Sequence, residues 1–348
     1  MMLEGQRVLI TGGTGSLGHA VTRRLLTGEL GRPARVTVFS RDEAKQHYMR
    51  LSYLHRSAAT DEIIYENSRQ LLRFVIGDMR DYASVLGAVR DADIIIHAAA
   101  LKQVPTCEYF PFQAVQTNLI GTEHLIRAIA SPETSVQSVV GISTDKACKP
   151  INVMGMTKAI MERLLVEANL RGRTRVACVR YGNVLATRGS VVPLFLDQIA
   201  RGGPVTVTLR EMTRFLLSLD RAVDAVFAAL REAEAGETYV PRVPAARVID
   251  VAEVLIDGRD IPIQVTGIRP GEKVHEIMVS DEERYRTADR GDYHVIKPML
   301  PELAAAHNPG GTVLDGEYSS SQVTLDTPGL RALLAPLMLP GFTVDATS

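Results

Sequence analysis

The stretch RVLITGGTGSLGHAVTRRLL, residues 7–26, decides the fold of this 348-residue chain. Residues 7–11 form a short apolar run typical of a buried strand, and residues 17–28 have the spacing of an amphipathic helix. Between them lies a G-x-x-G-x-x-G pattern. Glycines at such a turn let the backbone approach a pyrophosphate, and the N-terminus of the following helix favours its charge. The stretch therefore predicts a dinucleotide-binding turn rather than a glycine turn without a ligand. The residues expected to contact the dinucleotide are Gly12, Thr14, Gly15, Ser16, Leu17 and Gly18.

The alternation of strand and helix continues along the first half of the chain. Continuous apolar strands separated by helices are typical of parallel strands buried on both faces. We therefore predict an α/β fold, a Rossmann-type doubly wound parallel sheet, over residues 1–185. Further strands are expected at 35–40, 71–78, 92–100, 138–144 and 174–184. Further helices are expected at 41–54, 81–90, 111–130 and 155–170.

After about residue 185 the segments become shorter and richer in glycine and proline. This change predicts a smaller C-terminal substrate-binding domain, mainly residues 186–300, over the carboxyl ends of the strands, where ligands bind in such sheets. Some later segments are expected to return to the first domain. Residues 301–348 are expected to form a partly irregular C-terminal tail.

Composition narrows the function classes. The net charge is −1 and the arginines are scattered, so neither nucleic acid nor a membrane surface is an expected partner. The cysteine count is three, with no C-x-x-C motif, which suggests neither disulfides nor a metal site and fits a reducing cytoplasm. The sequence has no uninterrupted apolar window of about 18 residues, so no membrane span is expected.

The end of the second predicted strand discriminates between cofactors. NAD sites usually place an acid there, but this chain has Ser40 and Arg41, with Lys45 one helical turn later. Arginine and lysine can pair with a 2′-phosphate, so we predict NADP. The alternative is that Arg41 faces solvent.

Two further strand ends are expected to line the cofactor. Asp78 and Met79 follow the third strand, near the adenine, and Ala98, Ala99 and Ala100 follow the fourth, where the cofactor backbone passes closely. Packing roles are the alternative for both groups.

The stretch STDKACKPINVMGMTK, residues 143–158, bears the candidate chemistry. Met154 and Lys158 have the spacing of a Tyr-x-x-x-Lys pair, but a thioether cannot transfer a proton, so Met154 is expected to pack. Asp145 and Lys146 follow the fifth strand directly. Lysine is a base only if its pKa is lowered, and aspartate is an acid only where water is excluded. The alternative is a helix cap beside a solvated charge.

These segments together resemble the extended short-chain dehydrogenase/reductases, and within them the inverting UDP-N-acetylglucosamine 4,6-dehydratases. The resemblance covers nearly the whole chain. Its motifs are FSRDEAKQ, GDMRD, HAAALKQVPTCEYFP, STDKACKPINVMGMTK, RYGNVLATRGSVVPLF, EMTRFLLSLDRAV, RPGEKVHE and EYSS. It implies a UDP-hexosamine substrate, oxidation at C4, loss of water across C5 and C6, and hydride return to C6. It also implies a homo-oligomer, a dimer or a hexamer.

The resemblance assigns roles to individual residues. Lys146 would take the C5 proton, Asp145 would protonate the C6 oxygen, Thr144 would hydrogen-bond the C4 oxygen, and Lys158 would hold the nicotinamide ribose. Part of the family has methionine at the position of Met154. Either Lys146 or a relay through Thr144 and the ribose hydroxyl would then deprotonate the C4 hydroxyl.

The substrate side involves polar residues from several loops. Asn183 could bond a diphosphate, Lys102 could reach the sugar or its phosphates, and Arg180 is expected to anchor structure. Arginine suits phosphate and a carboxylate suits ribose hydroxyls, which fits Arg214, Arg269 and Glu272. Surface salt bridges are the alternative for these residues. His97 and His275 lack ligand spacing and are expected to be structural.

Three other activities stay open at this point. A C4 epimerase on the same fold would need a base for the C4 hydroxyl but no acid–base pair at C5 and C6. A 5,6-dehydratase would stop at an exocyclic enol ether. A non-catalytic NADP-binding protein would act through its partners.

Overall fold

A computed structural model describes residues 2–54, 69–185, 190–305 and 314–337. Their largest sheet has nine strands in the order β14-β15-β10-β6-β5-β4-β1-β2-β3. The seven strands from β3 to β10 run parallel, whereas β15 and β14 are antiparallel additions at one edge. This confirms the predicted α/β, doubly wound fold. The strands are β1 (Arg7–Thr11), β2 (Arg35–Ser40), β3 (Leu72–Ile76), β4 (Ile94–His97), β5 (Ser138–Ile142), β6 (Arg175–Val179), β10 (Thr238–Pro241), β14 (Thr287–Arg290) and β15 (Tyr293–Ile296).

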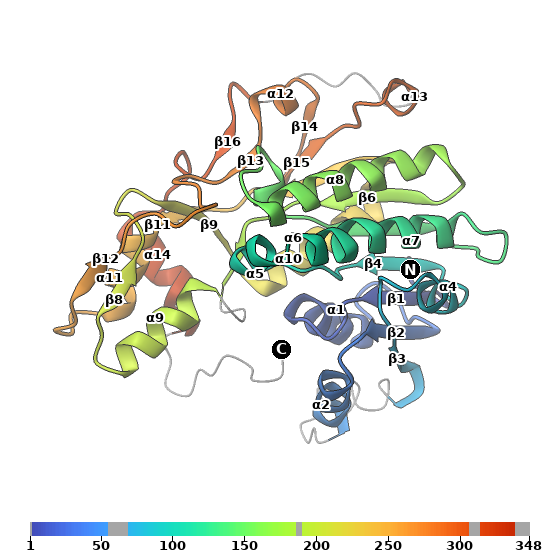
Figure 1. The fold of residues 1–348 in the computed structure, drawn as a ribbon, viewed down its shortest axis with the longest axis horizontal. Helices are drawn as coiled ribbons and strands as arrows, with labels where there is room; N and C mark the ends of the chain where they lie inside the picture. The colour runs from blue at the N-terminus through green and yellow to red at the C-terminus, as the bar shows by residue number, and fades with distance from the viewer. Residues whose placement is uncertain (1, 55–68, 186–189, 306–313, 338–348) are drawn as a thin grey trace.

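Helices cover both faces of this sheet (Figure 1). Because side chains alternate along a strand, Val8 and Ile10 of β1 enter one core cluster and Leu9 enters another. The first cluster lies under α1 (Ser16–Leu26) and α10 (Leu219–Glu232). The second lies under α4 (Tyr82–Val89), α7 (Gly121–Ile129) and α8 (Val153–Glu167).

Two predicted elements differ from the observed ones. The strand expected at 174–184 is two strands, β6 and β7 (Asn183–Val184), and β7 belongs to a second sheet with β9 (Thr213–Leu217) and β11 (Ala245–Arg247). The chain leaves the first sheet at Gly182, where an added Cβ would lie 2.6 Å from Phe215 Cβ. The helix expected at 111–130 contains a π-helical segment, η1 (Val115–Ile120), between α6 (Pro111–Ala114) and α7.

A smaller lobe lies at the left of Figure 1, beyond α5 and α6. It contains the β11-β9-β7 sheet and the pair β12-β8, with a separate core that includes Phe195, Leu255 and Leu330. Residues after 301 contribute to it, because Leu330 belongs to α14, which is red in Figure 1. The elements of this lobe not yet given are β8 (Val205–Val207), β12 (Ile263–Val265), α9 (Val191–Ala200), α11 (Val248–Ile256) and α14 (Thr327–Leu334).

A third pairing connects late segments of the chain. β13 (Ile277–Val279) and β16 (Tyr318–Ser319) form an antiparallel pair.

None of the helices in the described part of the chain has the length and apolar character that a bilayer crossing requires. The remaining helical elements are α2 (Glu43–Leu54), α5 (Val104–Tyr109), α12 (Asp281–Arg284), α13 (Pro301–Ala304), η2 (Asp145–Ala147), η3 (Ala168–Leu170) and η4 (Ala335–Leu337).

Candidate active site

The turn between β1 and α1 fits a dinucleotide pyrophosphate. Gly12 has φ +67°, and an added Cβ would lie 2.7 Å from the Ala99 nitrogen. At Gly18 an added Cβ would lie 2.3 Å from the Gly13 oxygen, so only glycine lets the helix pack this closely. Gly15, the exposed N-cap of α1, would meet only the Gly12 oxygen at 3.4 Å. The amino end of α1 is thus accessible to an anion.

β2 ends at Ser40 and is followed by Arg41, so that the first carboxylate comes only at Asp42. Ser40 is buried, and Gln46 Nε2 donates to its Oγ at 3.2 Å and to its backbone oxygen at 3.0 Å. Arg41 is exposed and forms no ion pair within the described residues, so its guanidinium is available to a phosphate. The Lys45 amide donates to Asp42 Oδ1 at 3.0 Å. Gln46, which orients Ser40, was missed in the sequence.

The two other predicted cofactor segments follow the ends of β3 and β4. Arg80 donates to Asp78 at 2.6 Å, and this hydrogen bond holds the pKa of Asp78 below its usual value. Met79 is buried in the second core cluster. The backbone of Ala98 and Ala99 passes directly over Gly12. Cofactor contacts of these residues stay predictions.

Asp145 and Lys146 come together where β5 ends. Asp145 is 1% exposed, and its Oδ1 lies 3.1 Å from Lys146 Nζ and accepts from Thr144 Oγ1 at 2.8 Å. Its other oxygen, Oδ2, is buried without a hydrogen-bond partner in the described part of the chain. An orphaned buried carboxylate oxygen is costly unless a ligand satisfies it. The alternative of a helix cap beside a solvated charge does not fit Asp145, because it is buried and the cap of η2 is Thr144, whose side chain accepts from the Lys146 amide.

Residues from distant segments complete the cluster around Lys146. Glu276, 2% exposed, places Oε1 3.2 Å from Lys146 Nζ, and Asn183 Oδ1 lies 3.4 Å from the same nitrogen. Arg214 Nε lies 3.9 Å from Glu276 Oε1. Sequence reasoning missed Glu276, although it belongs to the quoted RPGEKVHE motif.

On the sequence-based expectation, Lys146 requires a lowered pKa to act as a base. Burial alone would lower its pKa, but Asp145 and Glu276 outweigh this effect and the pKa of Lys146 is raised. The resting site therefore holds an ammonium, not a free base. The condition for a base, a lowered pKa, is therefore not met in the resting site, because a second carboxylate, Glu276, faces the amine.

Met154 and Lys158 lie on the buried face of α8. Met154 is 4% exposed and packs with Cys107 and Ala114, which confirms that it is a packing residue. Lys158 Nζ donates to the Ile142 oxygen at 2.5 Å, and burial lowers the pKa of Lys158 to about 8. His97 bonds Thr11 and Thr122 through its two ring nitrogens, as a structural histidine does.

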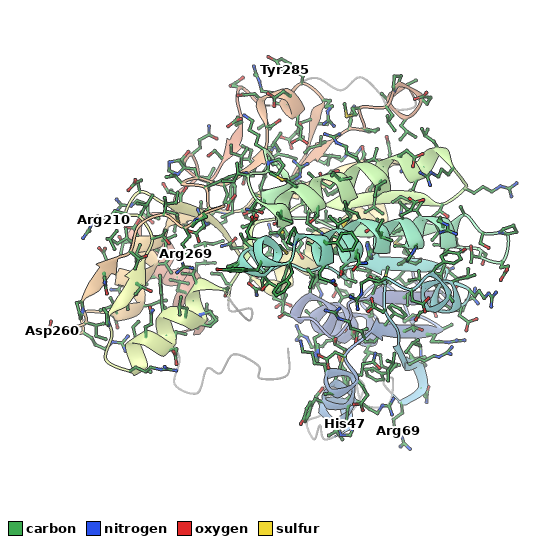
Figure 2. All side chains as sticks on the ribbon, viewed as in Figure 1. His47, Arg69, Arg210, Asp260, Arg269 and Tyr285 are labelled. Atoms are coloured by element: carbon green, nitrogen blue, oxygen red, sulfur yellow. The ribbon has the colours of Figure 1, made fainter. Side chains whose placement is uncertain are left out.

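The predicted substrate residues divide into two groups. Asn183 and the buried Arg214 belong to the Lys146 cluster. Arg269, labelled on the smaller lobe in Figure 2, is exposed, and its amide donates to Glu272 at 3.4 Å. Neither Arg269 nor Glu272 contacts the cluster within the described residues, although Asn152 Nδ2 ties their loop to the start of α8 through the Gly271 oxygen at 2.7 Å. Lys102 is exposed.

Comparisons with known proteins identify a family model and similar relatives that match most of the chain. The family model described as "Polysaccharide biosynthesis protein" matches residues 8–298. A protein named UDP-glucose 4-epimerase from Rickettsia bellii is 41% identical over 304 residues, covering 86% of this chain and 84% of the relative.

Solved structures extend the comparison to the fold. The crystal structure of Pen from Bacillus thuringiensis is 32% identical, has a TM-score of 0.85, and covers 97% of this chain and 100% of that one. DesIV, a dTDP-glucose 4,6-dehydratase from Streptomyces venezuelae solved with NAD and TYD bound, shares the fold at 22% identity and a TM-score of 0.65. That similarity covers 77% of this chain and 86% of DesIV.

Proposed function

This chain belongs to the polysaccharide biosynthesis protein family, and from that premise we propose that it is a nucleotide-sugar dehydratase. The substrate proposed is UDP-N-acetylglucosamine. Water would be removed across C5 and C6 through a 4-keto intermediate, with inversion at C5. The single observation that carries the proposal is the 3.1 Å contact between a buried carboxylate, Asp145, and the ammonium of Lys146.

An elimination needs a base at C5 and an acid at C6. Moving the shared proton from Lys146 to Asp145 creates both at once, because the amine becomes neutral as the carboxyl becomes an acid. The buried Asp145 Oδ2 has no partner in the described residues, so it can face the C6 oxygen. Thr144, which donates to Asp145 Oδ1 here, would turn to the C4 oxygen.

The proton count closes over the proposed cycle. The C4 hydroxyl and C5 each release one proton, and the leaving C6 oxygen and C5 each take one. The cluster therefore ends with the protons it began with. Met154 cannot take part, so a relay through Thr144 and the ribose hydroxyl would deprotonate the C4 hydroxyl. If Lys146 took that proton instead, it would have to pass it on before taking the C5 proton.

The glycine turn would hold a nicotinamide dinucleotide, which supplies hydride acceptance at C4 and hydride return at C6. Gly12, Gly15 and the amino end of α1 would bind its pyrophosphate, and Lys158 its nicotinamide ribose. The absence of an acid at the end of β2, together with the exposed Arg41, favours NADP over NAD.

Epimerisation at C4 is the second candidate, because curated relatives at 41% identity are named UDP-glucose 4-epimerase. An epimerase needs no proton transfer at C5. The Asp145–Lys146 pair therefore favours dehydration over epimerisation. Assembly as a dimer or hexamer and a cytoplasmic location remain part of the proposal.

Incubation with UDP-N-acetylglucosamine, and separately with UDP-glucose, in deuterated water tests both candidates. Dehydration predicts a product lighter by one water with deuterium at C5, read by mass spectrometry and NMR. Epimerisation predicts unchanged chemical composition, altered stereochemistry at C4 and no deuterium at C5. No reaction with either sugar would contradict both.

Variants then connect the activity to the cluster. Lys146→Ala should slow dehydration by about 100-fold or more, the lower end of what a positioned acid or base contributes. Glu133→Gln is the control, because Glu133 is exposed and pairs with Arg90 outside the cluster. A Lys146→Ala protein that works at nearly the parent rate would exclude the proposed base.

A further inference from the structure

We infer that Glu276 is a positioning residue of this site, which fixes the amine of Lys146 and sets the charge state from which it works. The inference rests on the proposed function, because it assigns a role inside that acid–base cluster. No part of the proposed proton transfers uses Glu276, yet it is among the most buried carboxylates of the described chain.

Two hydrogen bonds, to Asp145 and Asn183, and an ion pair with Glu276 surround the amine of Lys146. An ammonium has three N–H donors and no acceptor. Three oxygens surround Nζ: Asp145 Oδ1 at 3.1 Å, Glu276 Oε1 at 3.2 Å and Asn183 Oδ1 at 3.4 Å. Each comes from a different segment, so the position of Nζ is over-determined. Without Glu276, the amine would keep only one charged partner.

Glu276 is itself held by the quoted EYSS motif, which the proposed chemistry does not use. Ser320 Oγ accepts from the backbone amide of Glu276 at 2.9 Å, and the backbone amide of Ser320 donates to the backbone oxygen of Glu276 at 2.8 Å. Ser320 is fully buried, and its Oγ lies 2.6 Å from Thr213 Oγ1, which also lies 2.8 Å from His275 Nδ1. The motif thus fixes the backbone that carries the second carboxylate.

Two cations lie close to the carboxylate of Glu276. Arg214 Nε and Lys273 Nζ lie 3.9 and 4.0 Å from its two oxygens. Among the described residues, the carboxylates that face the amine of Lys146 are thus Asp145 and Glu276. The cations that face Glu276 are Arg214 and Lys273. Because Glu276 raises the pKa of Lys146, neutralising Glu276 must lower it. Neutral Lys146 would then be present at lower pH.

A titration of Lys146 tests this directly and needs no turnover. In protein labelled with ¹³C at lysine Cε, the Lys146 signal is the one that Lys146→Arg removes. Glu276→Gln should lower the pKa of Lys146 by about one unit or more, a tenfold change in the neutral fraction. Glu133→Gln, which removes the exposed charge that pairs with Arg90, should leave it unchanged. Equal pKa values for Lys146 in Glu276→Gln and the parent protein would overturn the inference.

The pH dependence of enzyme activity provides a second test of the inference. In Glu276→Gln, the alkaline limb of the kcat profile, where the Asp145–Lys146 pair loses its shared proton, should move to lower pH, with kcat reduced and KM little changed. A parent protein that dehydrates its substrate, with an unmoved limb in Glu276→Gln, would reject the inference alone. A shifted Lys146 titration in a protein that dehydrates nothing would reject the proposed function alone. If Glu276→Gln does not fold, Glu276→Asp tests the same point. The shorter side chain moves the carboxylate away from Lys146 Nζ, so the pKa of Lys146 should fall. An unchanged pKa of Lys146 in Glu276→Asp would overturn the inference.

Discussion

A single lysine illustrates how burial makes charge costly in this protein. Lys158 has no ion pair within the described residues, and its pKa falls from 10.5 to about 8. At about 1.4 kcal/mol per unit, this gap corresponds to about 3 kcal/mol. Since the folded pKa lies below the unfolded one, the cost is complete below pH 8 and disappears as the pH rises towards 10.5.

Lys158→Met should therefore stabilise the cofactor-free protein at pH 7 by up to about 3 kcal/mol, because methionine fills the buried position without a charge. The gain should shrink steadily between pH 8 and 10. Urea unfolding at several pH values measures it, with the exposed Lys149→Met as control. A gain independent of pH would mean that charge burial is not its cause.

Arg41 decides a different property, the choice of cofactor. Arg41→Ala should weaken NADP binding by about tenfold or more, because one charge-assisted hydrogen bond contributes about 1.5–3 kcal/mol. NAD binding should be unchanged. Fluorescence titration with each reduced dinucleotide measures both affinities. Arg35→Ala, at the opposite end of β2, should alter neither; an equal loss for NAD and NADP in Arg41→Ala would contradict the assignment.

At the scale of elements, the β1–α1 turn depends on how closely its helix approaches the strand. In Gly18→Ala the new methyl would lie 2.3 Å from the Gly13 oxygen, so α1 must move. We expect a loss of about 1–3 kcal/mol in stability, as in other overpacked sites, and at least tenfold weaker dinucleotide binding. Thermal unfolding and dinucleotide titration measure the two effects.

The control for this change is Gly87→Ala in α4, where an added Cβ meets nothing within 4 Å. Alanine should stabilise that helix by up to about 1 kcal/mol and leave dinucleotide binding unchanged. Similar behaviour of both variants would show that the close approach at Gly18 is unimportant.

Elements also show what a sequence can and cannot predict. The strand at 35–40 was predicted to its exact ends, since its apolar run is local, and the same holds for the glycine turn. The break after β6 was missed because it depends on Gly182 meeting Phe215, a contact between distant segments. Glu276 was missed for the same reason: no local pattern marks a carboxylate that pairs across the fold.

At the scale of the whole molecule, one buried arginine connects three elements. Arg180, just after β6, donates to Glu162 of α8 at 2.6 Å and to Glu283 of α12 at 2.7 Å. This confirms the structural role expected for Arg180. Burial would raise the pKa of Glu283, but Arg180 outweighs it and lowers that pKa to about 2.

Glu283→Gln should destabilise the protein by about 3 kcal/mol at neutral pH, since the pKa gap from 4.5 to about 2 corresponds to that energy. The folded pKa is depressed, so this stability is present above pH 4.5 and is lost as the pH falls towards 2. Urea unfolding from pH 7 down to pH 3 measures the difference. The exposed neighbour variant Glu282→Gln should show no comparable loss, and a constant difference for Glu283→Gln would contradict the ion-pair explanation.

The support of Glu276 by Ser320 has a consequence for the timing of synthesis. A ribosome makes Ser320 only after every strand of the large sheet. The nascent chain can therefore assemble its dinucleotide turn while the carboxylate beside Lys146 still lacks its anchor. On the proposed assignment, the support of the Lys146 amine is completed only when nearly all of the architecture already exists.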